Sequence, residues 1–216
     1  MVSKKLYNTV FRIVKKSLLC SESSHDLDHT SRVCRNADKL LAELPAADAD
    51  VVRLAALLHD IARPEEKGNS RVCHAKRGAE KAEKILKELN VEDPLAQRIV
   101  AAVRTHRYRD NNVPASLEAQ IVYDADKLDS LGAVGIGRAF LFAGNAGARL
   151  HNSAKQALNA EEYSYQDTAY REYLVKLSAV PNRMLTEPGR QLAEYYGRFM
   201  KNFFNEMNLQ IKGKKL

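Results

Sequence analysis

A histidine followed directly by an aspartate is the residue pair in this sequence best suited to catalytic chemistry. His59 and Asp60 stand at the end of a largely apolar run, Val51–Leu58, which has the character of a buried helix. Neighbouring helical residues point about 100° apart, so both side chains could hold one ion in the wedge between them. An imidazole and a carboxylate suit a divalent metal of borderline softness. The pair alone is a weak signal, because a lone helical histidine is more often a satisfied core or surface residue.

Two other segments carry the same residue types. Upstream, residues 25–33 read His-Asp-Leu-Asp-His-Thr-Ser-Arg-Val, and downstream, residues 124–129 read Asp-Ala-Asp-Lys-Leu-Asp. His29 precedes His59 by 30 residues, and Asp126 follows Asp60 by 66 residues. Five of the six histidines lie in or near these segments: His25, His29, His59, His74 and His106. This concentration favours a metal site over a set of unrelated side chains.

Helical periodicity dominates the chain, and no convincing strand pattern is present. Asp28 is a candidate N-cap, and Asp93-Pro94 places a proline at the first turn of a helix. Glu65 and Glu66 are predicted to lie in a solvated loop, and residues 144–166 to be irregular. The fold class predicted is all-α, a compact multi-helix bundle, with helices over residues 3–20, 28–44, 48–62, 74–89, 93–107, 116–130, 133–142, 167–179 and 188–208.

The second half of the sequence offers packing signals. Three glycines follow no strand, so they indicate close helix packing or a turn and not a dinucleotide site: Gly132, Gly135 and Gly137. Four tyrosines are predicted to pack in the core or a lid, with a base-stacking wall as the alternative: Tyr163, Tyr165, Tyr170 and Tyr173. The apolar set predicted for helix 188–208 is Leu192, Tyr195, Tyr196, Phe199 and Phe203.

The predicted helices would bring metal ligands together from separate parts of the chain. His29 would reach in from the first turn of one helix, His59 and Asp60 from the end of the next, and Asp126 from a later helix. Two nitrogens and two oxygens leave two positions of an octahedral sphere for water and a phosphate oxygen, as a hydrolytic site requires. The donor set predicts one divalent ion and disfavours Ca²⁺, with Mn²⁺ favoured and Fe²⁺, Co²⁺, Ni²⁺, Zn²⁺ or Mg²⁺ as alternatives.

The local phrases resemble the HD-domain metal-dependent phosphohydrolases over about residues 23–142. The phrases are His-x-x-Arg-Val from His29, Leu-Ala-Ala-Leu-Leu-His-Asp-Ile, Asp-Ala-Asp-Lys-Leu-Asp and Leu-Gly-Ala-Val-Gly-Ile-Gly-Arg. The resemblance implies an all-helical fold and hydrolysis of phosphate esters or anhydrides, often in nucleotides. It also implies the metal ligands His29, His59, Asp60 and Asp126. Residues 150–216 match no motif, so we expect a single HD-type domain over 1–216 with a C-terminal helical extension.

Three residues are candidates for proton transfer near the metal: Asp26, His74 and His106. Asp26 could orient a ligand or accept a proton from water, although an N-terminal cap is an equally good explanation. In similar proteins with two metals, histidines in positions like those of His74 and His106 hold the second ion. Beyond Asp60 the sequence shows no obvious bridging carboxylate, so phosphate binding or general-acid work remains open for both histidines.

Four basic residues are candidates for substrate binding: Arg63, Arg77, Lys127 and Arg138. Arg63 lies three residues after Asp60, where some nucleotide-specific members of the resembled family have an acidic residue, and this departure leaves their detailed chemistry open. Lys127 follows Asp126 and could hold a phosphate oxygen, and Asp129 could orient a histidine or arginine. A surface salt bridge is the alternative for Lys127 and Asp129.

Composition limits the possible partners. The 216 residues are 45% hydrophobic, enough for a sizeable core, and carry a net charge of +7. Much of the excess is at the termini, so a nucleic-acid polymer is disfavoured, and the charge could instead steer small anions. An 18-residue apolar run is absent, so no membrane span is expected. Three cysteines, an odd number, fit reduced thiols in a cytoplasmic protein. Association into a homo-oligomer remains open.

The sequence therefore predicts an enzyme, a metal-dependent phosphohydrolase acting on small phosphorylated compounds, with nucleotides first. Two alternatives share the same metal centre. One is a phosphodiesterase that acts on cyclic nucleotides or nucleic-acid ends. The other is a non-catalytic sensor that uses the metal to bind nucleotides.

Overall fold

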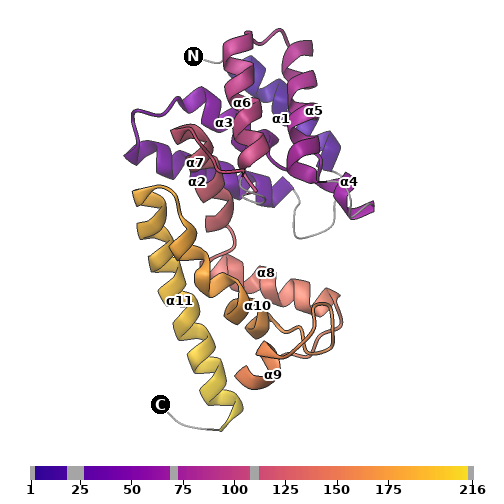
Figure 1. The fold of residues 1–216 in the computed structure, drawn as a ribbon, viewed down its shortest axis with the longest axis vertical. Helices are drawn as coiled ribbons and strands as arrows, with labels where there is room; N and C mark the ends of the chain where they lie inside the picture. The colour runs from indigo at the N-terminus through magenta and orange to yellow at the C-terminus, as the bar shows by residue number, and fades with distance from the viewer. Residues whose placement is uncertain (1–2, 19–26, 69–72, 108–111, 214–216) are drawn as a thin grey trace. The chain divides into compact units, whose positions relative to one another are not determined.

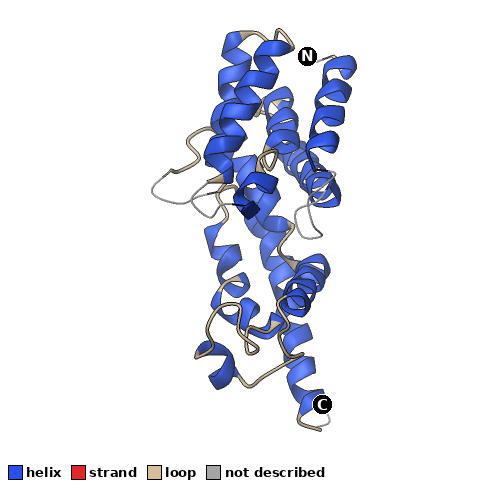
Figure 2. Ribbon diagram, turned by 90° about the vertical axis from the view of Figure 1, so that its right-hand side faces the viewer, coloured by secondary structure: helices blue, strands red, loops and turns tan. Residues whose placement is uncertain are grey.

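The structure, a computed structural model, describes residues 3–18, 27–68, 73–107 and 112–213, with residues 66–68 described by their backbone alone. Within these ranges every regular element is a helix, which confirms the predicted all-α class (Figure 1, Figure 2). Residues 1–126 form one compact unit and residues 127–216 form another. No helix in the described part of the chain is long and apolar enough to cross a membrane.

The first unit is arranged around one buried helix. Its elements are α1 (Lys4–Leu18), α2 (Leu27–Glu43), α3 (Ala49–Leu58), α4 (Arg63–Gly68), α5 (His74–Glu88), α6 (Asp93–Thr105) and all but the last residues of α7 (Leu117–Leu128). The central helix α3 packs against α1, α2 and α6, and α5 lies along α6 (Figure 1). The residues that follow α3, His59 and Asp60, therefore lie in the middle of the unit.

Helix α3 is apolar over most of its surface, with Arg53 as its exposed residue, which is typical of a helix packed against protein on most sides. Seven of its ten residues are buried: Val51, Val52, Leu54, Ala55, Ala56, Leu57 and Leu58. Its start is fixed by Asp48, whose carboxylate accepts hydrogen bonds from the backbone N–H groups of Asp50 and Val51. An apolar helix with a fixed start places its last residues at a defined depth in the core.

Polar contacts tie the start of α3 and the flank of α2 to α7. Arg98 donates to Asp48 and to Glu118 at 2.8 Å each, and the backbone N–H of Asp48 also donates to Glu118. The Asn36 amide of α2 donates to the carbonyl of Ala125 at 3.2 Å. These bonds set the position of the α7 segment that carries Asp126.

The solvated loop predicted at Glu65 and Glu66 is wrong, because α4 occupies Arg63–Gly68. A proline near the start of a helix loses only an N–H that has no partner there, so Pro64 is compatible with α4. Glu65 accepts a hydrogen bond from Arg77 of α5 at 2.9 Å and also pairs with Lys81. These contacts with α5 stabilise α4, because a helix of six residues forms few backbone hydrogen bonds of its own.

The second unit contains the remaining helices of the described chain. They are α8 (Gly132–Asn145), α9 (Ala154–Leu158), α10 (Ala169–Val175), the 3₁₀ helix η1 (Leu177–Arg183) and α11 (Glu187–Ile211). Helix α8 packs against α10 and α11, and η1 against α10 and α11. The predicted helix 167–179 is therefore two shorter elements, and residues 144–166 are mostly irregular, as predicted.

The buried face of α11 differs from the predicted one. The predicted set is mostly wrong, because Tyr195, Phe199 and Phe203 are exposed at 63%, 50% and 37%. The helix instead buries Gly189, Ala193, Met200 and Phe204. Phe204 packs against Tyr170 and Tyr173 at ring-centroid distances of 5.5 and 4.6 Å, so these two tyrosines belong to the core as predicted. Tyr163 and Tyr165 are exposed.

We predict that Gly135→Ala destabilises the second unit whereas Gly137→Ala does not. A Cβ at residue 135 would overlap the carbonyl group of Ser130, which is backbone and cannot rotate away, while a Cβ at residue 137 would meet nothing. We expect Gly135→Ala to lower the free energy of unfolding in urea by about 1–3 kcal/mol. Gly137→Ala should raise it by about 0.5–1 kcal/mol. Equal effects of the two substitutions would contradict the packing described.

Candidate metal centre

The site begins with two histidines that each follow the last residue of a helix. His59 is the C-cap residue of α3, and His106 is the C-cap residue of α6. In each ring, Nδ1–H donates to the carbonyl three residues earlier: His59 to Ala56 at 2.8 Å and His106 to Val103 at 2.7 Å. These bonds satisfy carbonyls that the helix ends leave without a partner. They also place the lone pair on Nε2, the nitrogen that faces the site.

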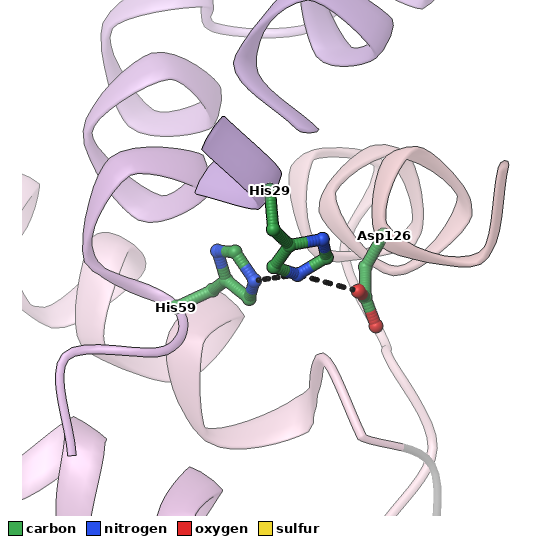
Figure 3. Close-up of side chains that lie close together, drawn as sticks. All are labelled: His29, His59 and Asp126. Carbon is green, nitrogen blue, oxygen red and sulfur yellow. Dashed lines mark hydrogen bonds and ion pairs between the residues drawn. The ribbon is translucent and has the colours of Figure 1, made fainter. Parts of the chain in front are cut away.

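The first ligand group consists of His29, His59 and Asp126, contributed by three helices (Figure 3). His29 Nε2 lies 3.2 Å from His59 Nε2 and 3.5 Å from Asp126 Oδ1. Asp60 Oδ2 completes this arrangement at 3.6 Å from Nε2 of each histidine. Ligands at about 2.1 Å from an octahedral ion lie about 3 Å apart when adjacent. The donor atoms are therefore spaced as a single divalent ion requires.

A second ligand group shares Asp60 with the first. It consists of Asp60, His74 and His106, all buried. Asp60 Oδ1 lies 3.4 Å from His74 Nε2 and 3.6 Å from His106 Nε2, and these two nitrogens are 3.2 Å apart. Each oxygen of the Asp60 carboxylate thus faces a different group. The turn after α3, with Arg63 N–H bonded to the Asp60 carbonyl at 2.9 Å, holds the aspartate in this position.

Two arginines converge on the second group. Arg63 Nη1 lies 2.9 Å from His74 Nδ1, and Arg107 Nη1 lies 3.1 Å from the same nitrogen. Arg63 opens α4, and Arg107 follows the C-cap residue of α6. Arg107 was not among the predicted substrate-binding residues. Its place directly after His106 is the signal in the sequence that could have included it.

Burial controls the protonation of His59. Burial of the ring, together with the nearby His106 and His29, lowers its pKa from 6.5 to about 4 against the attraction of Asp60 and Asp126. His59 is therefore neutral at neutral pH. Only a neutral imidazole can coordinate a metal, so the ring is kept in its binding form.

The structure distributes the other predicted site residues differently. Asp26 lies outside the described residues. Arg77 pairs with Glu65 and Glu80 on the surface of the first unit, where it holds α4 against α5. Lys127 follows Asp126 in α7. Arg138 donates to the Asp129 carboxylate at 2.7 Å within the second unit, the orienting contact predicted for Asp129.

Comparison with known proteins identifies related chains over most of the length. Residues 26–131 match the HD domain family. The Bacillus subtilis protein YpgQ is 32% identical over 203 residues, covering 92% of this chain and 90% of YpgQ. A crystal structure of YpgQ in complex with ADP has a TM-score of 0.74 at 28% identity, covering 96% of this chain and 98% of that one. A Bacillus thuringiensis HD-superfamily hydrolase has a TM-score of 0.76 at 27% identity, covering 98% and 99%.

The depressed pKa of His59 predicts how the metal-free protein responds to acid. Below its ordinary pKa of 6.5 the unfolded chain binds a proton at His59, whereas the folded chain does so only near pH 4. Stability is therefore lost as the pH falls from about 6.5 to about 4. With chelator present, we expect the free energy of unfolding in urea to fall by on the order of 2–3 kcal/mol more in the parent protein than in His59→Gln. The same acid response in both proteins would contradict the assignment.

Proposed function

Because this chain belongs to the HD-domain family, we propose that it is a metal-dependent phosphohydrolase acting on small phosphorylated compounds, with nucleotides as first candidates. The observation that carries the proposal is the convergence of His29, His59, Asp60 and Asp126 from separate helices within the spacing of one ion. The relative YpgQ has been crystallised with ADP, which supports a nucleotide as ligand.

The donor set fits a hydrolytic centre. Two imidazoles and two carboxylates would hold one ion, with Mn²⁺ favoured, and leave room in an octahedral sphere. When bound, such an ion would supply Lewis acidity to a phosphate oxygen and to the attacking water. Asp126 is partly exposed, with 16% of its side chain accessible, whereas His29, His59 and Asp60 are buried. Substrate would therefore approach past Asp126.

The remaining residues of the site would handle protons and charge. In hydrolysis the water oxygen forms a bond to phosphorus while the bond from phosphorus to the leaving oxygen breaks. The water gives up a proton, for which Asp26 and His106 are the proposed acceptors. The leaving oxygen takes a proton from solvent, and His74 is proposed to hold that oxygen by a hydrogen bond from its Nε2–H. Arg63 and Lys127, which directly follows Asp126, are proposed to balance the negative charge of the phosphate, as cations do in phosphoryl transfer.

Removal of Asp60 tests the metal centre directly. We expect Asp60→Ala to lower bound Mn²⁺ from about one ion per chain to nearly none and to reduce turnover at least about 100-fold, with helix content by circular dichroism unchanged. The matched control is Asp38→Ala, because Asp38 is an exposed carboxylate that pairs with Arg53 at 2.7 Å. Full metal occupancy in Asp60→Ala would disprove the ligand assignment.

A substrate panel separates the proposal from its alternatives. Nucleoside mono-, di- and triphosphates, cyclic dinucleotides and a generic phosphodiester are incubated with Mn²⁺, Co²⁺, Ni²⁺ or Mg²⁺, and released phosphate and products are measured. We expect turnover of the nucleoside phosphates. Turnover of the diesters alone would favour a phosphodiesterase. Nucleotides that raise the melting temperature without being hydrolysed would favour a sensor.

A further inference from the structure

The second ligand group has the composition of a metal site, but its surroundings are those of an anion site. We propose that Asp60, His74 and His106 do not hold a second metal ion, and that Arg63 and Arg107 beside them bind a phosphate oxyanion of the substrate. The inference rests on the proposed function for its ligand and gives a substrate-binding role to Arg107, which was not among the predicted substrate-binding residues.

Charge around the second group opposes a second cation. Arg63 and Arg107 both place Nη1 within hydrogen-bond distance of His74 Nδ1, at 2.9 and 3.1 Å. Guanidinium groups are charged at any accessible pH, so two fixed positive charges stand at this imidazole. Among the described residues the second group contains one carboxylate, Asp60, and its other oxygen faces the first group. One shared negative charge does not balance a second divalent ion beside two arginines.

Hydrogen-bond direction leads to the same conclusion. An arginine only donates, and both arginines lie nearest to His74 Nδ1, with Nε2 farther from Arg63 Nη1 at 3.5 Å. Nδ1 therefore accepts, and the proton of the neutral ring is on Nε2. That nitrogen can donate to His106 Nε2 at 3.2 Å and to Asp60 Oδ1 at 3.4 Å. His106 Nε2 can accept, because the other proton position of the ring donates to the Val103 carbonyl at 2.7 Å. The nitrogen that a second metal would need on His74 therefore carries a hydrogen.

In the first group, the proton of His59 is placed opposite to that of His74. His59 donates its Nδ1–H to the Ala56 carbonyl at 2.8 Å, so its Nε2 lone pair is directed at His29, Asp60 and Asp126. The proton of His106 is placed like that of His59, so in the second group it is His74 that turns a proton-bearing nitrogen toward Asp60. The first group thus presents lone pairs and carboxylates to a cation, whereas Arg63 and Arg107 beside the second group present N–H donors to an anion.

The two arginines are held for this role by different elements. Arg63 lies on α4, which Glu65 anchors to α5 through Arg77 and Lys81. Arg107 follows the end of α6, where His106 is fixed by its bond to Val103. Both arginine side chains are partly accessible, so a ligand can reach them. Planar guanidinium groups bind phosphate through paired N–H donors, which matches a ligand whose other end lies at the metal.

Metal stoichiometry and phosphate binding test the inference without requiring turnover. Mn²⁺ titration of the full-length protein by calorimetry is expected to give one ion per chain. Binding of inorganic phosphate to the Mn²⁺-loaded protein is expected to weaken at least about 10-fold in Arg107→Met and in Arg63→Met, with Mn²⁺ affinity retained. Arg107→Lys should weaken it less, because it keeps the charge and loses the paired donors. In Arg63→Met/Arg107→Met, His74 loses both donors, and a second Mn²⁺ should bind.

Arg104→Met is the matched control, because it removes the same charge from an exposed position near the end of α6 and should leave phosphate binding unchanged. Two Mn²⁺ ions per chain in the parent protein, with the second lost in His74→Ala, would overturn the inference. So would phosphate affinity that is the same in the parent and both single arginine variants. If the protein binds two ions and hydrolyses nucleotides, the inference fails and the proposed function stands. If it binds one ion and phosphate binding depends on the arginines but no substrate is hydrolysed, the proposed function fails and the inference stands.

Discussion

The Asp60 carboxylate is the interaction on which the arrangement of the first unit depends. Its two oxygens face two different ligand groups, with His29 and His59 on one side and His74 and His106 on the other. A carboxylate can be shared in this way only if its depth and rotation are fixed. Helix α3 fixes the depth of Asp60, because seven of its ten residues are buried, and the turn that begins at its last residue fixes the rotation.

Burying four histidines beside an aspartate is unfavourable unless each polar atom has a partner. Two of the histidines meet this requirement with the same hydrogen bond, since His59 and His106 each donate to a carbonyl in the last turn of the helix that they follow. Such a bond closes the helix end and orients the ring in one contact. Burial lowers the pKa of His59 to about 4, so this ring is neutral at neutral pH. Stability and ligand geometry are therefore coupled at the same residues.

The sequence predicted the parts of the protein that follow from strong local patterns. The apolar run before His59 and the three motif segments were enough to predict the helical class and a ligand set whose members lie together. It failed at α4, because a six-residue helix is stabilised by the contacts of Glu65 with α5 and not by its own periodicity. It also failed on the face of α11, where aromatic residues sit on the exposed side and Met200 and Phe204 on the buried one. Hydrophobicity alone ranks Phe203 and Phe204 equally.

The convergence of the two arginines could not be read from spacing, because Arg63 and Arg107 are 44 residues apart and meet only through His74. Residue type alone would count the four histidines and Asp60 as ligands for two ions. Hydrogen-bond direction separates His74 from the others, since a ring that accepts from arginine at Nδ1 carries its proton on Nε2, the nitrogen that faces Asp60. Positive charges would then lie on both sides of one carboxylate, a metal cation within the first group and two guanidinium groups beside the second. A phosphate ester or anhydride, with several anionic oxygens on one small group, has the charge distribution that such a pair of sites would bind.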